Sequence, residues 1–287
     1  MEAIEVAAES DLVEVEELSS RVADWDGSMT LTGYPPWQRI LSELSQRLGA
    51  FGLDVTAPLS VEWYNAAVPR ALHLPWLGRD RAPLAILVGN SRAIWEPFKS
   101  ALRKQPALLA ETHPLDAYVR RSVTSALSSF RLVDAYSSTG SVPAREDPGI
   151  KAAVYWDFDT RPGRLVAMQR LACISGMAYL NEEAHLCVHK KFGQWFALRA
   201  VVLFEVDPPT ERPEILQDPS TSEDRERLRA EVKAALDHPD IFNRFEESQR
   251  KWLAVRDAIH PNHPMRYSPD QIEYHYTHKK DILMRGS

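Results

Sequence analysis

The sequence predicts an α+β domain. At 287 residues, 44% of them hydrophobic, the chain is long enough to bury a full core. Some segments have apolar residues at helical spacing and others alternate like strands. The two kinds follow one another without strict alternation, which favours α+β over a doubly wound sheet.

The charge balance excludes several classes of partner. The formal net charge is -6 and the pI is near 5.9, so nothing indicates the basic surface that nucleic-acid binding needs. The N-terminus is acidic, and no run of about 18 apolar residues occurs. Two cysteines, Cys173 and Cys187, do not suggest a disulfide framework. We therefore expect a cytoplasmic protein with no nucleic-acid or membrane partner.

The domain boundary is predicted near the Pro-Pro pair that follows Tyr34. Residues 1–34 are acidic and weakly periodic, so we expect an extension there and the folded domain in residues 35–287. A helix is predicted from Pro36, ended by Gly49. Its apolar positions at helical spacing are Trp37, Ile40, Leu41, Leu44 and Leu48.

The middle of the chain alternates between strand and helix patterns. Residues 61–76 indicate a strand and a turn-rich segment, and the apolar run 82–90 indicates a buried strand. Helices are expected over 91–104 and 113–129. Two alternating segments, RLVDAYSS and AAVYWDFD, are predicted strands on either side of a loop near 139–149.

The C-terminal half contains an unusually apolar segment. Residues 163–183 are apolar on most helical faces, which predicts a buried helix. HLCV and WFALRAVVLF are then separated by KKFGQ, a spacing typical of a hairpin. A long loop follows, with Ser220 and Glu223 as a predicted cap of the next helix. Two last helices are expected over 241–259 and 269–283, the second starting at Ser268.

Several common catalytic and cofactor motifs do not occur in the sequence. It has no G-x-G-x-x-G after a strand, no G-x-x-x-x-G-K-[ST], no H-E-x-x-H and no paired C-x-x-C. The pattern D-x-H-x-x-G, with which some corrinoid enzymes place a histidine beneath cobalt, is also missing. We predict no catalytic side chain of these classes.

The segment HLCVH has the residue types of a zinc site. In a regular strand His185, Cys187 and His189 would share one face, and imidazole with thiolate suits zinc. The alternative is that Cys187 is buried packing, which is the commoner state of a cysteine in an apolar strand. We predict packing and no metal.

Arg199 stands in the middle of an apolar run and needs an anion. If WFALRAVVLF is a regular strand, this residue shares a face with Trp195, Ala197, Val201 and Leu203. One interpretation pairs it with a neighbouring carboxylate, such as Asp157 or Asp159. The other is a bound anion: a flavin phosphate or the carboxylates of a small thiol such as glutathione.

Arg256 in WLAVRDAI raises the same question, with a solvated helix face beside Asp257 as the simpler interpretation. Lys279 and Lys280 would add positive charge to such a pocket. Five aromatic residues can either wall a cavity or pack in the core, and the core is the commoner place. They are Trp63, Tyr64, Trp156, Tyr179 and Trp195.

A longer pattern resembles the CblC family of cobalamin-processing proteins, the cyanocobalamin reductases and alkylcobalamin dealkylases. The segments that carry the resemblance are VEWYNAAVPRALHLPW, VYWDFD through RPGRLVAMQ to ISGMAY, CVHKKFGQWFALRAVVL and VRDAI, in this order. The likeness runs from about residue 36 to 282. CVHKKFGQWFALRAVVL is its most specific part.

The resemblance implies a nitroreductase-like fold, a mixed sheet with flanking helices and a large ligand cavity. It implies an enzyme that binds cobalamin base-off and removes its upper axial ligand. Reduced flavin, FMN or FAD, would drive decyanation, and glutathione would dealkylate alkylcobalamins. A monomer or weak homodimer is expected, with a downstream cobalamin-trafficking protein as a partner.

The resemblance also implies site residues. Arg199 and Arg256 match arginines that hold glutathione. The mammalian members have a histidine at the position of Cys173 and tyrosines at the positions of Leu180 and Asn181. The first of these differences means that the resemblance does not imply an upper-face histidine here. The positions matching cobalamin contacts are Asp157, Val166, Ala167, Met168, Gln169, Leu180, Asn181, Glu182, Cys187 and Leu198.

Two other functions remain open. One is a flavin-dependent reductase of another substrate, because this fold supports many chemistries. The other is a carrier that binds cobalamin and passes it on without catalysis.

Overall fold

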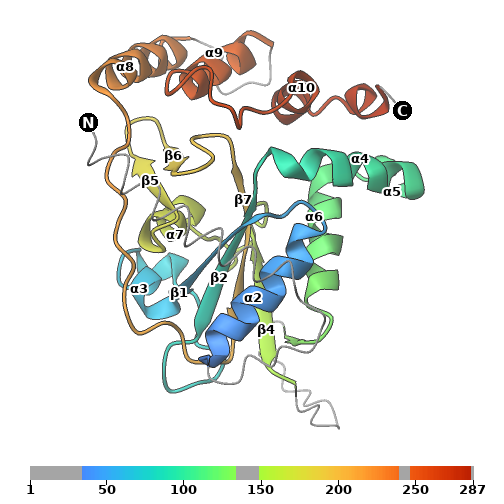
Figure 1. The fold of residues 1–287 in the computed structure, drawn as a ribbon, viewed down its shortest axis with the longest axis vertical. Helices are drawn as coiled ribbons and strands as arrows, with labels where there is room; N and C mark the ends of the chain where they lie inside the picture. The colour runs from blue at the N-terminus through green and yellow to red at the C-terminus, as the bar shows by residue number, and fades with distance from the viewer. Residues whose placement is uncertain (1–33, 134–148, 239–245, 286–287) are drawn as a thin grey trace, which may run out of the picture. The chain divides into compact units, whose positions relative to one another are not determined.

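The fold is built around a mixed sheet of five strands (Figure 1). The computed structural model describes residues 34–133, 149–238 and 246–285. In the sheet the strands lie in the order β1-β2-β7-β4-β3, with β3 and β4 parallel and the other neighbours antiparallel. A second sheet pairs β5 with β6. The strands are β1 Val55–Ser60, β2 Leu84–Asn90, β3 Arg131–Leu132, β4 Lys151–Trp156, β5 Ala178–Asn181, β6 Leu186–His189 and β7 Ala197–Phe204.

Helices cover both faces of the five-stranded sheet (Figure 1). The α-helices are α2 Pro36–Gly49, α3 Val61–Asn65, α4 Trp95–Lys104, α5 Ala107–Ala110, α6 Pro114–Ala126, α7 Met168–Ile174, α8 Ser222–Leu236, α9 Glu246–Asp257 and α10 Pro269–Thr277. The short 3-10 turns are η1 Arg70–Leu72, η2 Arg92–Ile94 and η3 Lys280–Met284.

The strand β7 divides the interior into two cores. Ala200, Val202 and Phe204 face the first core, which α2, α4, α6 and α10 complete. Val201 and Leu203 face the second core, which α3, α7, β5 and β6 complete. All five side chains are buried, as expected for a strand with both faces covered.

Several of the predicted helices and strands are confirmed. The structure has the α+β architecture, and α2 spans the predicted helix with Ile40, Leu44 and Leu48 buried. The strand β2, the helices α4 and α6 and the start of α10 also lie where predicted. At that last start the Ser268 hydroxyl accepts a hydrogen bond from the Gln271 amide at 3.3 Å. The predicted loop 139–149 and the first residues of the predicted helix 241–259 fall mostly outside the described residues.

The strand predicted from residue 61 is wrong, because a helix begins there. The strand β1 lies just before it, and the Ser60 hydroxyl accepts a hydrogen bond from the Glu62 amide at 3.2 Å as the N-cap of α3. This cap within an apolar run starts a helix although the following residues alternate like a strand.

The long buried helix predicted over 163–183 is also wrong. The helix α7 covers only Met168–Ile174, and β5 follows from Ala178. The break is Gly176, whose φ of +69° is left-handed and whose missing side chain leaves room for the Glu214 carbonyl. The segment is apolar on most sides because the helix and the strand are both buried.

The predicted hairpin between HLCV and WFALRAVVLF does not form. Instead β6 pairs with β5, while β7 pairs with β2 and β4. His189 and Gly193 exchange backbone hydrogen bonds of 2.8 and 2.9 Å in a tight turn, after which the chain enters the other sheet. The glycine therefore marks a turn, as predicted, but between two sheets.

The cap of α8 lies one residue later than predicted. The Thr221 hydroxyl accepts from the Asp224 amide at 3.1 Å, and the Asp224 carboxylate accepts from the Thr221 amide at 3.0 Å. This reciprocal capping box replaces the predicted pair Ser220 and Glu223.

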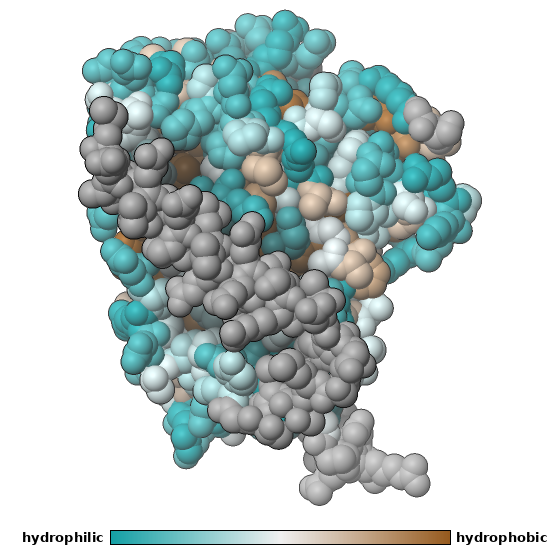
Figure 2. Space-filling view, viewed as in Figure 1, coloured by the Kyte–Doolittle hydropathy of each residue, from teal (hydrophilic) through white to brown (hydrophobic). Residues whose placement is uncertain are grey.

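The face of the molecule drawn in Figure 2 is mostly polar where the structure describes it. Figure 2 shows hydrophilic residues over most of the visible described surface, with hydrophobic residues in small separate groups. In the described ranges, no helix combines the length and apolar character that crossing a membrane requires. Residues 1–33 lie outside these ranges, so the division at residue 34 remains a prediction.

Replacing Gly89 by alanine should separate β2 from β7. A Cβ at Gly89 would lie 2.6 Å from the Ala197 carbonyl oxygen. We expect the Gly89→Ala variant to lose about 1–3 kcal/mol of unfolding free energy, measured by urea denaturation. As a control, Gly49→Ala adds a Cβ with no atom within 4 Å and should change stability by less than about 0.5 kcal/mol. Equal effects of both substitutions would contradict this account.

Candidate functional site

A recess of about 480 Å³ opens beside the end of β4. The segment leading into α7, the strand β5 and the turn toward β6 form its other walls. Its lining residues are Asp157, Val166, Ala167, Met168, Gln169, Arg170, Leu180, Glu182 and His185. The structure thus brings most of the predicted cobalamin-contact positions to one place.

The volume of this recess does not single it out. Three other recesses of about 410, 520 and 480 Å³ lie elsewhere on the described surface. All are within the usual range for small-molecule sites, roughly 300–1,000 Å³. The recess beside β4 is distinguished by its lining, and a large enclosed cavity remains a prediction.

Hydrogen bonds hold the walls of the recess in place. The Tyr64 hydroxyl accepts from the Ala167 amide at 2.9 Å, which fixes the segment before α7 to α3. The Gln169 side-chain amide donates to the His185 carbonyl and joins α7 to the turn before β6. Sequence analysis placed Tyr64 as a cavity wall or core residue, and the structure shows a buried residue that supports the recess from behind.

Three predicted cobalamin positions do not line the recess. Asn181 is buried and accepts from the Ala184 amide at 2.9 Å, so it shapes the turn between β5 and β6. Cys187 and Leu198 pack in the second core. Burial raises the pKa of the Cys187 thiol to about 12, which leaves it protonated and unreactive.

The HLCVH segment does not assemble a metal site. His185 has a left-handed φ of +49° and precedes β6, so the three side chains do not follow one regular strand. His189 Nδ1 accepts from the Lys191 amide at 2.9 Å, and burial lowers the pKa of this histidine to about 4. Within the described ranges no group of three or more His, Cys, Asp or Glu side chains is placed to hold a metal ion.

Arg199 occupies a β-bulge, which the sequence analysis did not foresee. Val88 pairs with Ala200 and Gly89 with Leu198, so Arg199 has no partner on β2. The regular alternation assumed for this strand is therefore interrupted, and Leu198 packs in the second core with Val201. Bulges of this kind redirect side chains and are common beside active sites.

The Arg199 guanidinium is buried, with 8% of the residue exposed, and a neutral group holds it. Its Nε donates to Asn90 Oδ1 at 2.7 Å. In the part of the chain that the structure describes, it makes no ion pair. Asp159 pairs instead with Arg161 at 2.6 Å and Arg164 at 3.3 Å, which holds the pKa of its carboxyl well below the usual range.

Asp157 lies close to Arg199 without forming an ion pair within the described residues. Its backbone amide donates to the Arg199 carbonyl at 3.0 Å. Solvent reaches Asp157 in the recess, yet the surrounding protein excludes enough water to raise the pKa of its carboxyl to about 6. The Arg199 charge opposes this shift, and Asp116 adds to it.

Arg256 is buried on α9, so the solvated-face interpretation is wrong. Only 7% of the residue is exposed. Its Nε donates to the Gln194 carbonyl at 2.9 Å, one terminal nitrogen donates to the Phe196 carbonyl at 3.1 Å, and the other lies 3.3 Å from His275 Nε2. Its nearest acidic neighbour in sequence, Asp257, pairs with Arg266 at 2.6 Å.

Aromatic rings complete the surroundings of Arg256. Its guanidinium carbon lies 4.6 Å from the Trp195 ring centroid and 4.9 Å from that of Tyr267, within cation–π range. His275 contacts the same guanidinium, and burial, with Arg256 and Arg199 nearby, lowers its pKa well below the ordinary value. His275 is therefore neutral and accepts the hydrogen bond from Arg256.

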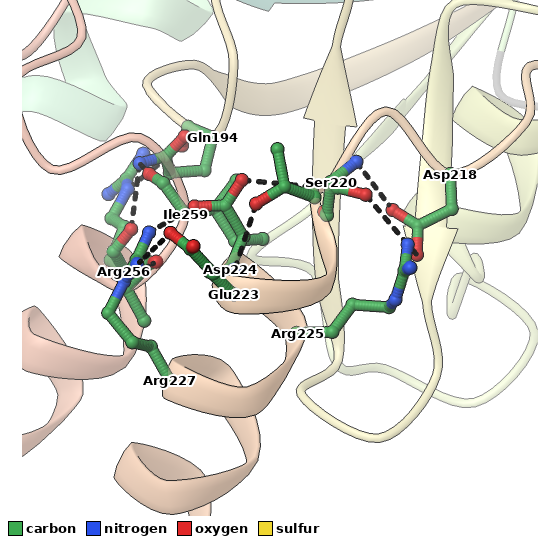
Figure 3. A network of polar contacts seen from close by, with 11 residues as sticks. Gln194, Asp218, Ser220, Glu223, Asp224, Arg225, Arg227, Arg256 and Ile259 are labelled. Carbon is green, nitrogen blue, oxygen red and sulfur yellow. Dashed lines mark hydrogen bonds and ion pairs between the residues drawn. The ribbon is translucent and has the colours of Figure 1, made fainter.

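A polar network anchors the end of α9 that carries Arg256 (Figure 3). The Gln194 side-chain amide donates to the Arg256 carbonyl at 2.8 Å and to the Ile259 carbonyl. From α8, Arg227 donates to the Ala258 carbonyl at 3.3 Å and pairs with Asp224. The last carbonyls of a helix have no donor within the helix, so they need donors from elsewhere. Nothing in the sequence around Gln194 indicated that it has this role.

The remaining predicted residues lie apart from the recess. Lys279 is exposed, and Lys280 donates to the Glu111 carbonyl at 2.7 Å. The ring of Trp156 stacks on that of Phe158, with centroids 5.6 Å apart. Trp63 packs in the second core, Trp195 in the cluster around Tyr267, and Tyr179 against β6, α8 and α9.

Fold and site together define an α+β domain with a recess beside β4, a buried Arg199 close to its wall residue Asp157, and a second buried arginine, Arg256, held by its own contacts. The model of the methylmalonic aciduria and homocystinuria type C family matches residues 153–284. A cyanocobalamin reductase / alkylcobalamin dealkylase from Bos taurus is 30% identical over 261 residues, covering 83% of this chain and 79% of the relative. The Homo sapiens protein of the same name is 27% identical over 258 residues, covering 85% and 79%.

A solved structure supports the same fold. It is that of a C. elegans B12-trafficking protein CblC, with a TM-score of 0.59 and 17% identity, covering 86% of this chain and 95% of that one. The chain belongs to the cyanocobalamin reductase / alkylcobalamin dealkylase family, as the resemblance implied.

The two arginines should differ in their importance for stability. Replacing Arg256 by methionine removes the donor from two buried carbonyls and His275, each costing about 1–3 kcal/mol, whereas Arg199→Met leaves one amide oxygen without its donor. We expect Arg256→Met to cost about 2 kcal/mol more unfolding free energy than Arg199→Met in urea denaturation. Equal costs would show that Arg199 is as much a structural residue as Arg256.

Proposed function

We propose that this protein processes cobalamin by removing its upper axial ligand. It decyanates cyanocobalamin and dealkylates alkylcobalamins, the two activities that the names of its relatives state. The observation that carries this proposal is the recess beside β4, because it gathers most of the positions expected to contact cobalamin.

Cobalamin binds base-off at this recess, which receives part of the corrin, with its dimethylbenzimidazole tail detached from cobalt. The wall positions Val166, Ala167 and Met168 contact the corrin through backbone and shape, and Gln169, Leu180 and Glu182 complete the wall. Asn181, Cys187 and Leu198 act from behind, by holding the β5–β6 turn and the second core. This placement fits a site that tolerates varied side chains.

Glutathione binds beside the corrin, and Arg199 is its main anchor. Arg199 uses one N–H group in its bond to Asn90, which leaves the guanidinium fork for a carboxylate of the tripeptide. Arg256 uses most of its donors within the protein and contributes mainly positive charge and the position of the neighbouring loop. Positioning the thiol beside the alkyl group makes the attack effectively intramolecular.

The reacting thiol comes from glutathione and not from the protein. The thiolate is the nucleophilic form of a thiol, and the high pKa of Cys187 keeps that residue protonated. For decyanation, reduced FMN or FAD supplies the electrons. No side chain of the protein forms a covalent intermediate in either reaction.

Visible spectroscopy tests this function directly, because the corrin spectrum reports its ligands and oxidation state. The purified protein is mixed with cyanocobalamin and then with reduced FMN; a second sample receives methylcobalamin and then glutathione. We expect one spectral change on binding and a further change with reductant or thiol. A change on binding alone would indicate a carrier, and flavin retention without any change in the corrin would indicate a reductase of another substrate.

Replacing Arg199 by alanine should weaken glutathione binding without weakening cobalamin binding. We expect the KM for glutathione in methylcobalamin dealkylation to rise about 10- to 100-fold, the effect of losing one charge-assisted carboxylate contact. Cobalamin affinity, measured by spectral titration, should change little. Arg229→Ala, which removes an exposed cation paired with Glu183, is the control and should affect neither value. Equal loss of both affinities would indicate a purely structural Arg199.

A further inference from the structure

Asp157 is a carboxyl group that the recess presents to its ligand. It follows the end of β4 and lines the recess together with the apolar side chains of Val166, Met168 and Leu180. Its backbone amide bond to the Arg199 carbonyl fixes its position beside β7. Asp157 is exposed to solvent in the recess, and Gln169, Arg170, Glu182 and His185 also line it. A carboxyl with a raised pKa in a ligand site is a candidate for proton transfer.

The charges around Asp157 leave its proton available. Arg199 on β7 attracts the charged form without pairing with it in the described structure, and Asp116 on α6 repels the charged form. Arg170 and Glu182, which also line the recess, pair with each other at 2.7 Å, and His185 is a further lining residue. With a pKa of about 6, raised chiefly by desolvation, roughly one-tenth of the Asp157 carboxyl is protonated at pH 7, far more than of an ordinary aspartate.

We propose that Asp157 is the general acid of decyanation and donates its proton to the departing cyanide. This inference rests on the proposed function. An electron from reduced flavin reduces Co(III) to Co(II), and the cobalt–carbon bond breaks with its electron pair going to cyanide. Cyanide takes the Asp157 proton and leaves as hydrogen cyanide, and the carboxylate recovers a proton from solvent. Because cyanide is the conjugate base of a weak acid, it leaves more readily with a proton.

Dealkylation does not require a proton donor for its leaving group. The glutathione sulfur forms a bond to the alkyl carbon, and the electron pair of the cobalt–carbon bond stays on cobalt. The thiol loses its proton, and the leaving corrin takes none. A proton donor in the recess therefore serves one of the two reactions, and the second reaction is an internal control in the same protein.

The test compares Asp157→Asn with the wild-type protein in three reactions at saturating substrate. They are decyanation with reduced FMN, reduction of aquocobalamin with the same flavin, and glutathione-dependent dealkylation of methylcobalamin. We expect kcat for decyanation to fall about 100-fold, the typical contribution of a general acid, and at least about tenfold more than kcat of the other two reactions. Spectral titration checks that the variant still binds cyanocobalamin.

The pH profile gives an independent readout. Because the protonated carboxyl is the active form, kcat for decyanation by the wild-type protein should fall as pH rises above about 6, and Asp157→Asn should lack this fall. The neighbouring variant Asp116→Asn removes a charge that raises the pKa of Asp157, so it should move the fall to lower pH.

Three other outcomes would contradict the role proposed for Asp157 or the proposed function. Equal loss in all three reactions would make Asp157 a binding residue, and an undiminished decyanation rate in Asp157→Asn would exclude it as the acid. A wild-type protein that does not change the cyanocobalamin spectrum with reduced flavin would overturn the proposed function itself, and the role of Asp157 would fall with it.

Discussion

Two guanidinium groups lie buried in this domain without a carboxylate partner among the described residues. Taking an ion out of water costs several kcal/mol in real proteins, so each group needs compensation. Arg256 obtains it from two carbonyls, an imidazole and the faces of Trp195 and Tyr267. Arg199 has one amide oxygen. The same burial thus produces a structural residue in one case and unused binding capacity in the other.

The bulge on β7 lies next to Asp157, a residue that lines the recess. A regular strand would have continued the alternation of Val201 and Leu203, which bury their side chains in the second core. The extra residue leaves Arg199 without a backbone pairing partner on β2, and its side chain donates to Asn90 at the end of that strand. Its carbonyl meanwhile bonds the Asp157 amide, so one irregular residue joins the cationic site to the wall of the recess.

Local sequence signals predicted most elements but not their pairing. The helix from Pro36 has apolar residues at helical spacing and residues 82–90 form a continuous apolar run, and both predicted elements are present. The segment 163–183 failed because burial on all sides looks the same in a helix and in a strand. The hairpin failed because strand pairing depends on contacts distant in sequence, here between β7 and both β2 and β4.

For the site, too, the sequence located residues but did not reveal their contacts in three dimensions. Resemblance located the recess positions, since they lie in contiguous segments. It gave no sign of Gln194 or His275, whose roles come from contacts with the distant helix α9. Nor did it separate Asp157 from Asp159, two residues apart. Asp159 is neutralised by Arg161 and Arg164, whereas the pKa of Asp157 is raised chiefly by desolvation, with the charges of Arg199 and Asp116 acting in opposite directions.

If Arg199 binds the glutathione carboxylate and Asp157 donates the proton, as proposed, the two reactions are electrostatically coupled, because the charge of Arg199 lowers the pKa of Asp157. An anion bound at Arg199 would cancel part of the positive charge that lowers the pKa of Asp157, so the carboxyl would hold its proton more tightly. When Asp157 is protonated and neutral, it no longer competes with the bound anion for the positive charge of Arg199. The neutral acid and the bound carboxylate therefore favour each other, so a single bulged strand residue links the two reactions.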